Sequence, residues 1–389
     1  MIRGEMILVG AESLEEGGAD FFTPLLRGTL ADLGIRLTAK SAVEDDEEEV
    51  AERLKVGLKR SRVIALIGRM GSGERDLTRK VLAKVTKRRL VLAGPSESTE
   101  GQHLVPFGAV LIANPHGKNS GLLMEVDGRW IMAFPGLMEA ESILLRTLPL
   151  LAEQSGLIAG SGVLLRTCGL DLESVRDRVK GAASPPGGSL TLFPALVGVD
   201  LELFTANRED RLAAESALRE RLGESLYGAC GEILEGVVAQ LLKASGKRLA
   251  LAESCTGGKI GERLTRVPGS SDYFDRALVT YSNRSKEELL RIDPHLFARH
   301  GAVSQEVAAA MAEGVRTLSR ADIGLSVTGI AGPGGGSEEK PVGLVCIALS
   351  RSSGTESWRH QFHGDREAVR AQAAQMALNH LRLSLTGVS

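Results

Sequence analysis

The densest group of chemically useful side chains is the segment Ala-Glu-Ser-Cys-Thr-Gly-Gly at residues 252–258. A short apolar run precedes it and a helical pattern follows, so it occupies the turn from a strand into a helix. Backbone N–H groups at such a turn, together with the helix dipole, can hold a phosphate or stabilise an oxyanion. Gly257 and Gly258 let a ligand approach the backbone closely. The alternative is that Ser254 or Thr256 only caps the helix, as most serines at such turns do.

A second segment, Thr-Tyr-Ser-Asn-Arg-Ser-Lys at 280–286, directly follows another strand-like run. A lysine in a partly buried site loses part of its preference for the charged form and can serve as general base for a serine hydroxyl. Lys286 is a candidate for that role. A solvated surface lysine is the competing interpretation, because lysine is rarely buried without a partner. Tyr281 either orients the proton or packs.

A third, glycine-rich segment runs from 326 to 337, again just past a predicted strand. Its glycines suit a loop around a phosphate or ribose, although a flexible surface loop has the same composition. It lacks the Gly-Lys-Ser/Thr of a P-loop and the GxGxxG spacing of a dinucleotide fold. All three segments follow the carboxyl ends of strands, which is the edge where open α/β sheets bind ligands.

The elements that must position these segments form an α/β unit from residue 227 onward. The periodicity predicts strands at 249–252, 277–280, 323–328 and 342–349, and helices at 232–244, up to 264, at 304–318 and at 366–383. Asp365 is the expected N-cap of the last helix.

The preceding chain divides into two further parts. Short apolar runs at 6–9, 63–67, 90–92 and 109–112 alternate with amphipathic stretches such as 21–33, which predicts an α/β domain with a largely parallel sheet over 1–151. Residues 152–226 contain glycine- and proline-rich loops, a β-like stretch at 190–203 and a charged, alanine-rich helix at 210–222. We expect a small α+β connector there.

Composition limits the function classes. The 389 residues are 43% hydrophobic and 25% charged, with a formal net charge of -2, which favours soluble protein and gives no sign of a nucleic-acid partner. The start of the chain lacks a signal-peptide pattern and no apolar run could span a membrane, so we expect a cytoplasmic protein. The four cysteines form no CxxC pair and predict neither a zinc site nor disulfides.

The three segments, in this order, resemble the C-terminal amidase domain of the CinA (competence/damage-inducible) family over 227–389. The family motifs stand here at 252–258, 279–286 and 328–343, with further matches at 267–271, 300–304 and 364–366. The resemblance implies hydrolysis of the amide of nicotinamide mononucleotide to nicotinic acid mononucleotide and ammonia, in pyridine-nucleotide salvage. It also favours a homodimer.

Carried over by position, the resemblance makes Ser254 the nucleophile, Lys286 its general base and Tyr281 a helper near the amide, with no metal or other cofactor. The N–H groups around Thr256 and Gly257 are the candidates for oxyanion or phosphate contacts. The expected substrate-binding residues are Glu253, Thr256, Gly257, Gly258, Asn283, Thr328, Gly329, Ala331, Gly332 and Arg366.

The N-terminal part resembles the family's other domain, of the molybdopterin-binding (MoCF) fold, which in some members hydrolyses ADP-ribose with a divalent metal. The best match is at 113–117 and 134–139. Two expected carboxylates are replaced, by Ala11 and by Arg75, which argues against a metal in this domain. Two alternatives to the amidase remain open: a bifunctional enzyme whose N-terminal pyrophosphatase uses Glu12 and Asp76, and a non-catalytic nucleotide-binding scaffold.

Overall fold

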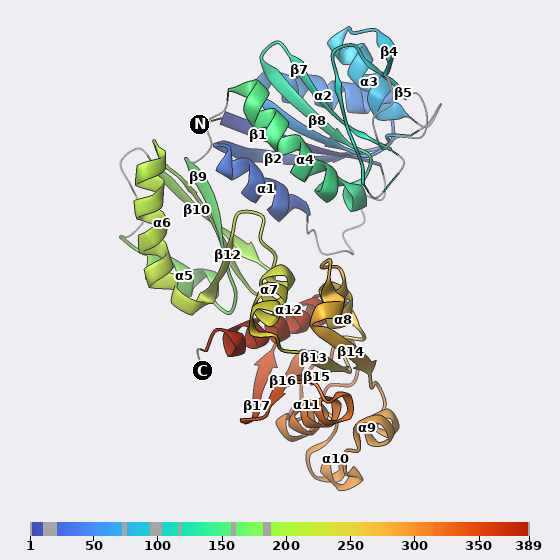
Figure 1. The fold of residues 1–389 in the computed structure, drawn as a ribbon, viewed down its shortest axis with the longest axis vertical. Helices are drawn as coiled ribbons and strands as arrows, with labels where there is room; N and C mark the ends of the chain where they lie inside the picture. The colour runs from blue at the N-terminus through green and yellow to red at the C-terminus, as the bar shows by residue number, and fades with distance from the viewer. Residues whose placement is uncertain are drawn as a thin grey trace.

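Three larger β-sheets, each with its own helices, follow one another along the chain (Figure 1). The computed structural model describes residues 2–10, 22–71, 76–93, 103–115, 117, 119–156, 161–181 and 188–387. The predicted motif residues Ala11, Glu12 and Arg75 lie outside these ranges.

The first unit is a six-stranded sheet in the order β2-β1-β3-β8-β7-β6. Its first four strands are parallel, and β7 and β6 are antiparallel. Helices α1 and α4 share one core with the sheet, and α2 and α3 share the core on its other face, so the central strands are mainly apolar. Glu5 of β1 is buried and pairs with Arg53 and Arg60. A separate hairpin pairs β4 with β5. The elements are β1 (Ile2–Val9), α1 (Phe22–Asp32), β2 (Ile35–Val43), α2 (Glu47–Arg60), β3 (Val63–Ile67), α3 (Leu77–Thr86), β4 (Leu90–Ala93), β5 (His103–Pro106), β6 (Val110–Ile112), β7 (Gly121–Val126), β8 (Arg129–Phe134) and α4 (Leu137–Ser155).

The connector is a four-stranded antiparallel sheet in the order β10-β11-β9-β12, with two helices. The predicted β-like stretch at 190–203 is the hairpin of β10 and β11. Arg36 of β2 donates to Ser189 Oγ at 2.7 Å, and the Arg27 guanidinium of α1 lies 3.9 Å from the Phe193 ring centroid, so polar and cation–π contacts join the connector to the first unit. The elements are β9 (Gly162–Thr167), α5 (Leu172–Val179), β10 (Ser189–Ala195), β11 (Gly198–Phe204), α6 (Arg208–Leu222) and β12 (Leu226–Ala229).

The last unit is a five-stranded sheet in the order β14-β13-β15-β16-β17. Strands β14, β13 and β15 are parallel, and β16 and β17 are antiparallel to their neighbours. Helices α7, α8 and α12 cover one face and α9, α10 and α11 the other, which buries all of β13. The elements are α7 (Leu234–Ser245), β13 (Leu249–Glu253), α8 (Lys259–Thr265), β14 (Phe274–Val279), α9 (Asn283–Leu290), α10 (Pro294–His300), α11 (Gln305–Ser319), β15 (Ile323–Gly329), β16 (Leu344–Arg351), β17 (Gly354–Gln361) and α12 (Arg366–Leu385).

The sequence predicted most of this last unit. The N-cap at Asp365 is confirmed, since its carboxylate accepts from the Ala368 N–H at 2.8 Å. Strand β17 and the short helices α9 and α10 were not predicted. Gly-Thr-Glu-Ser-Trp-Arg-His-Gln is a polar, half-exposed edge strand without a buried apolar face, so the hydrophobic pattern gives little indication of it.

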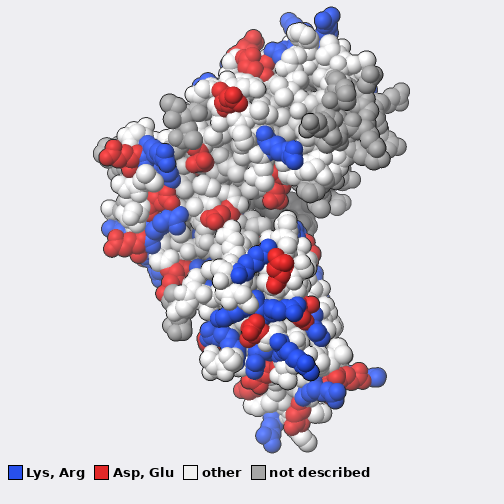
Figure 2. All heavy atoms as spheres, in the orientation of Figure 1, with Lys and Arg blue, Asp and Glu red and all other residues white. Residues whose placement is uncertain are grey.

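Charged side chains of both signs interleave over the connector and the last unit on the face drawn in Figure 2. No continuous basic stripe crosses the described residues on this face. A search of the described helices finds none that is long and apolar enough to cross a membrane.

A buried ion pair fixes α8, the helix that follows the Ser254 turn. Arg263 of α8 contacts the Glu235 carboxylate of α7 at 2.6 Å, and the two side chains are 7% and 1% exposed. The same guanidinium donates to the Gln375 side chain of α12 at 2.8 Å. Three helices of one sheet face therefore meet at a single buried cation.

We expect Arg263→Met to lower the free energy of unfolding of the last unit by about 3–5 kcal/mol, because it leaves the Glu235 carboxylate buried and unpaired. The double variant Arg263→Met/Glu235→Met should recover most of this loss. Calorimetry of the full chain would measure both shifts. If the Arg263→Met protein unfolded at the same temperature as the wild type, the ion pair would not be what holds these helices together.

Candidate active site

The three predicted segments meet at one edge of the last sheet. Glu253, the final residue of β13, lies opposite Val279 of β14 and Val327 of β15. Because the three strands are parallel, the residues that follow them project from the same edge. The Ser254 N–H extends the ladder by donating to the Val327 carbonyl at 2.9 Å. Ser254 and Thr280 thus stand side by side at the carboxyl ends of their strands.

The Lys286 amine contacts the Ser254 hydroxyl in the buried end of this edge. Nζ donates to Ser254 Oγ at 3.2 Å and to the carbonyls of Thr280 and Tyr281 at 2.8 and 3.3 Å. Lys286 is only 1% exposed. Its burial lowers the pKa of the amine from its usual value to about 8. A substantial fraction of Lys286 is therefore neutral near physiological pH and can accept a proton.

Helix α9 places Lys286 there. Its N-cap is Ser282, which accepts from the Ser285 N–H at 3.1 Å, while Ser285 Oγ accepts from the Ser282 N–H at 3.1 Å. This reciprocal capping box begins the helix immediately after the β14 segment. Lys286 falls in the first turn, where its side chain reaches back toward the strand end.

Cys255 lies next to Ser254 but is a poor nucleophile. It is 5% exposed, and burial raises the pKa of its thiol to about 12. Because the thiolate is the reactive form, a thiol held protonated at neutral pH has little nucleophilic power. A Cβ on Gly329 would lie 3.0 Å from Cys255 Sγ, so the thiol packs against the neighbouring strand end.

Glu253 supports the turn and does not face the cavity. Its fully buried carboxylate accepts from the N–H groups of Gly258, Ile260 and Gly261 at 2.9, 3.2 and 2.9 Å. These contacts satisfy the first backbone donors of α8. Glu253, expected among the substrate-binding residues, therefore caps α8 in this structure and does not line the cavity. The reason is geometric, because the pleat directs Glu253 and the Ser254 turn to different sides.

One of the backbone N–H groups of the turn is used in a hydrogen bond within the turn itself. Gly257 N–H donates to the Ser254 carbonyl at 3.1 Å, which occupies the donor expected to contact an oxyanion or phosphate. Among the described residues, the N–H groups of Cys255 and Thr256 donate to no backbone carbonyl, and both are directed at the Cys255 sulfur. Gly257 and Gly258 have φ of +60° and +94°, values that side chains with a Cβ rarely adopt. Because sulfur is a weak acceptor, the donors of the turn that a stronger oxygen acceptor can recruit are those of Cys255 and Thr256.

The mouth of the site is bridged by Arg366. Its guanidinium donates to the Gly332 carbonyl at 2.7 Å and to the Tyr281 hydroxyl at 2.9 Å. Tyr281 is 60% exposed. Thr328, in contrast, is buried, and its hydroxyl donates to the Ala302 carbonyl at 2.9 Å. Arg366 therefore joins the glycine-rich loop to the segment that carries Lys286.

These side chains enclose a cavity of about 180 Å³. Six of the expected substrate-binding residues are absent from its wall: Glu253, Thr256, Gly257, Gly258, Asn283 and Gly332. Asn283 is exposed at the start of α9. Three wall residues, Cys255, Ala302 and Val303, were not assigned a role from the sequence. The wall consists of Ser254, Cys255, Tyr281, Lys286, Ala302, Val303, Thr328, Gly329, Ala331 and Arg366.

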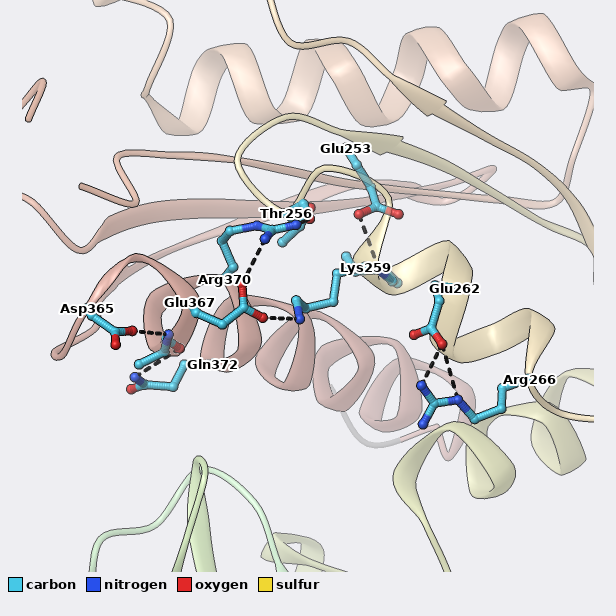
Figure 3. A network of polar contacts seen from close by, with 11 residues as sticks. Glu253, Thr256, Lys259, Glu262, Arg266, Asp365, Glu367, Arg370 and Gln372 are labelled. Atoms are coloured by element: carbon cyan, nitrogen blue, oxygen red, sulfur yellow. Dashed lines mark hydrogen bonds and ion pairs between the residues drawn. The ribbon is translucent and has the colours of Figure 1, made fainter. Parts of the chain in front are cut away.

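A further polar network behind the turn was also missed from the sequence (Figure 3). Arg370 of α12 donates to the Thr256 carbonyl at 2.8 Å and to Glu367 at 2.8 Å, and Glu367 also pairs with Lys259 of α8. The spacing of Arg366 and Arg370, four residues apart on one helical face, could have indicated that both reach the site.

In the first unit, Asp76 does not fit the role of a metal ligand. Its carboxylate accepts from the Arg79 N–H at 3.0 Å as the N-cap of α3, and it pairs with the Arg79 guanidinium at 2.6 Å. Both side chains are buried. A carboxylate neutralised by an internal cation attracts a divalent ion weakly. Across the described ranges, no three His, Cys, Asp or Glu side chains gather as a metal site would require.

Comparison with known proteins assigns both ends of the chain. The CinA C-terminal domain model matches residues 232–385, and the probable molybdopterin binding domain model matches residues 5–148. A putative competence-damage inducible protein of Caldicellulosiruptor bescii is 35% identical over 97% of this chain and 98% of its own. A CinA-like protein of Geobacter metallireducens is 36% identical over 99% of each chain.

Among solved structures, a CinA superfamily protein from Klebsiella pneumoniae is 38% identical over 40% of this chain and 96% of its own, with a TM-score of 0.39. The family models and the near full-length relatives cover the MoCF-like first unit as well as the unit that holds Ser254 and Lys286. The chain therefore belongs to the CinA family.

Proposed function

We propose that the last unit hydrolyses the amide of a pyridine nucleotide, with nicotinamide mononucleotide as substrate and nicotinic acid mononucleotide and ammonia as products. The observation that carries this proposal is the Ser254–Lys286 pair, whose Oγ and Nζ atoms lie 3.2 Å apart at a cavity wall. A buried amine with a lowered pKa beside a serine hydroxyl is the arrangement that activates a weak nucleophile.

In the first half of the reaction, neutral Lys286 takes the Ser254 proton while Oγ bonds to the amide carbon. The carbonyl oxygen becomes an oxyanion, a far stronger acceptor than the Cys255 sulfur, which the N–H groups of Cys255 and Thr256 are suited to stabilise. The protonated Lys286 then gives its proton to the leaving nitrogen, and the C–N bond breaks. Ammonia departs and an ester to Ser254 remains.

In the second half, Lys286 accepts a proton from water as the water oxygen attacks the ester carbon. Collapse of the second oxyanion returns the electron pair to Ser254 Oγ, which regains its proton from Lys286. The net change is amide plus water to carboxylic acid plus ammonia. Every proton passes through the Lys286 amine, so the step needs no metal.

The cavity supports a substrate that enters by one end. Its volume of about 180 Å³ is below the roughly 300–1,000 Å³ of pockets that enclose most of a ligand. An amide-bearing ring fits the closed end, while the rest of the molecule extends past Tyr281 toward Arg366. The Arg366 guanidinium is exposed at this mouth and suits a phosphate group.

The two alternative functions receive less support. The Asp76–Arg79 pair weighs against a metal-dependent pyrophosphatase in the first unit. A purely binding role leaves the buried Lys286 amine beside Ser254 without a purpose. Assembly as a homodimer stays a prediction from the family resemblance.

We expect Ser254→Ala to abolish ammonia release from nicotinamide mononucleotide, and Cys255→Ala to retain most of it. The reason is that the Cys255 thiol stays protonated, because burial raises its pKa to about 12. Steady-state assays of ammonia release would measure both variants. If Ser254→Ala were active and Cys255→Ala inactive, the nucleophile would be Cys255 and not Ser254.

We expect Lys286→Ala, Lys286→Arg and the near-isosteric Lys286→Met to lower kcat by roughly a hundredfold to ten-thousandfold, since none of them supplies a base. In the wild type, kcat/KM should rise about tenfold per pH unit and level off above a pH of about 8, where the Lys286 amine becomes neutral. Arg284→Ala, on the exposed side of α9, is the matched control and should keep wild-type turnover. Near-normal kcat in Lys286→Arg would move the base role elsewhere, first to Tyr281.

We expect the first unit to release little or no AMP from ADP-ribose with magnesium, manganese or cobalt. The assay uses the full chain carrying Ser254→Ala, so that amide hydrolysis does not contribute. The Arg79 cation beside Asp76 disfavours a second cation there. Robust metal-dependent AMP release that disappears in Asp76→Ala would instead support the bifunctional enzyme.

A further inference from the structure

Arg370 of α12 contacts the nucleophile turn from behind, on the side away from the substrate. Its guanidinium donates to the carbonyl of Thr256 at 2.8 Å (Figure 3). Thr256 is fully buried, whereas the Arg370 side chain is 27% exposed. A Cβ placed on Gly257 would lie 3.3 Å from the same guanidinium, so the contact is close as well as polar.

Two peptide groups connect this contact to the proposed oxyanion donor. In a trans peptide the C=O and N–H bonds point in opposite directions. The Thr256–Gly257 peptide binds Arg370 through its carbonyl and the Ser254 carbonyl through the Gly257 N–H, at 3.1 Å. The Ser254–Cys255 peptide, held by that carbonyl, directs its own N–H of Cys255 the opposite way. That N–H donates to no backbone carbonyl and has only the weakly accepting Cys255 sulfur as partner, and Cys255 lines the cavity.

We propose that Arg370 is a positioning residue, which fixes the Cys255 N–H for oxyanion stabilisation through these two peptide groups in series. The proposal rests on the amide hydrolysis proposed above. A hydrogen bond from a cation polarises the chain of peptide dipoles as well as orienting it, because hydrogen bonds in series strengthen one another. Arg370 does not touch the substrate. Its effect reaches the reacting carbonyl through the backbone alone.

The guanidinium is itself held in place by a paired carboxylate. Glu367, one turn earlier on α12, accepts from Arg370 at 2.8 Å and pairs with Lys259 in the first turn of α8. The bond from Lys259 is the main reason that the pKa of Glu367 is lowered, so the carboxylate stays charged at neutral pH. The network joins α12 to the helix that leaves the turn, and holds the turn at Thr256 and at Lys259.

The neighbouring arginine has a different function. Arg366 faces the mouth, where it contacts the Gly332 carbonyl and the Tyr281 hydroxyl. We therefore assign substrate binding to Arg366 and the positioning of the nucleophile turn to Arg370. Loss of Arg366 should raise KM through the substrate phosphate, whereas loss of Arg370 should lower kcat.

The test compares Arg370→Met, Arg370→Lys and the control Gln372→Ala in the full chain. Gln372 lies on the same helix and donates only to the His363 and Ala368 carbonyls. We expect Arg370→Met to lower kcat about tenfold to a hundredfold, less than loss of a direct oxyanion donor, with KM within threefold. The pH midpoint set by Lys286 should not move. Arg370→Lys should recover part of kcat, because an ammonium can still donate to one carbonyl.

A second measurement does not depend on amide hydrolysis. Amide hydrogen exchange at Gly257, followed by NMR, should be at least tenfold faster in Arg370→Met than in wild type or Gln372→Ala. Each protein is measured at the same number of degrees below its own thermal unfolding midpoint. Unchanged exchange, or a kcat within twofold of wild type, overturns the inference. A wild-type protein that releases no ammonia would refute the proposed function instead, and the exchange rates would still decide the role of Arg370.

Discussion

The burial of one amine beside one hydroxyl is the interaction on which the rest of the site depends. Lys286 is almost fully buried, and it contacts Ser254 Oγ and two backbone carbonyls. No carboxylate of the described residues is among its hydrogen-bond partners. A carboxylate partner would favour the charged amine and oppose base catalysis. The carbonyls instead satisfy the donors of the amine while burial holds its pKa near 8. This balance requires a dry, rigid site.

The fold provides that rigidity through a sheet covered on both faces. Helix α9 begins at its capping box directly after the β14 segment and brings Lys286 over the strand end. On the other face, the Glu253 carboxylate holds the first N–H groups of α8, and the Arg263–Glu235 pair holds that helix against α7 and α12. The nucleophile turn is thus fixed by residues that do not touch the substrate. Groups that fix reacting atoms in this way reduce the reorganisation needed in the transition state.

The sequence predicted which segments meet, because parallel strands bring their carboxyl ends to one edge. Ser254, Tyr281 and Thr328 were all expected there, and each lies on the cavity wall. It could not predict which way each side chain turns. Glu253 stands next to the nucleophile in the chain, yet its carboxylate is directed under α8.

The sequence also did not predict contacts between residues that are far apart in the chain. Arg370 meets Thr256 across 114 residues of sequence, and only the packing of α12 on this face brings them together. Asn283, chosen for its place in a motif, is an exposed helix residue. In the first unit the apolar runs at 6–9, 63–67 and 109–112 predicted strands β1, β3 and β6 of the sheet, whereas the run at 90–92 lies in the separate hairpin and β2, β7 and β8 were not predicted. The pairing of Asp76 with Arg79 follows from the cap of α3 and not from any motif.

The central claim is that burial lowers the pKa of Lys286 enough for a fraction of the amine to be neutral and basic at physiological pH. The most direct measurement is the titration of Lys286 itself. Full-chain protein with isotope-labelled lysine side chains can be followed by NMR from about pH 6 to 11, with Lys286→Met to assign the signal. The account predicts that the Lys286 signal titrates at a pKa of about 8, well below the roughly 10.4 of solvated lysines. A Lys286 signal that titrates together with the surface lysines would contradict it.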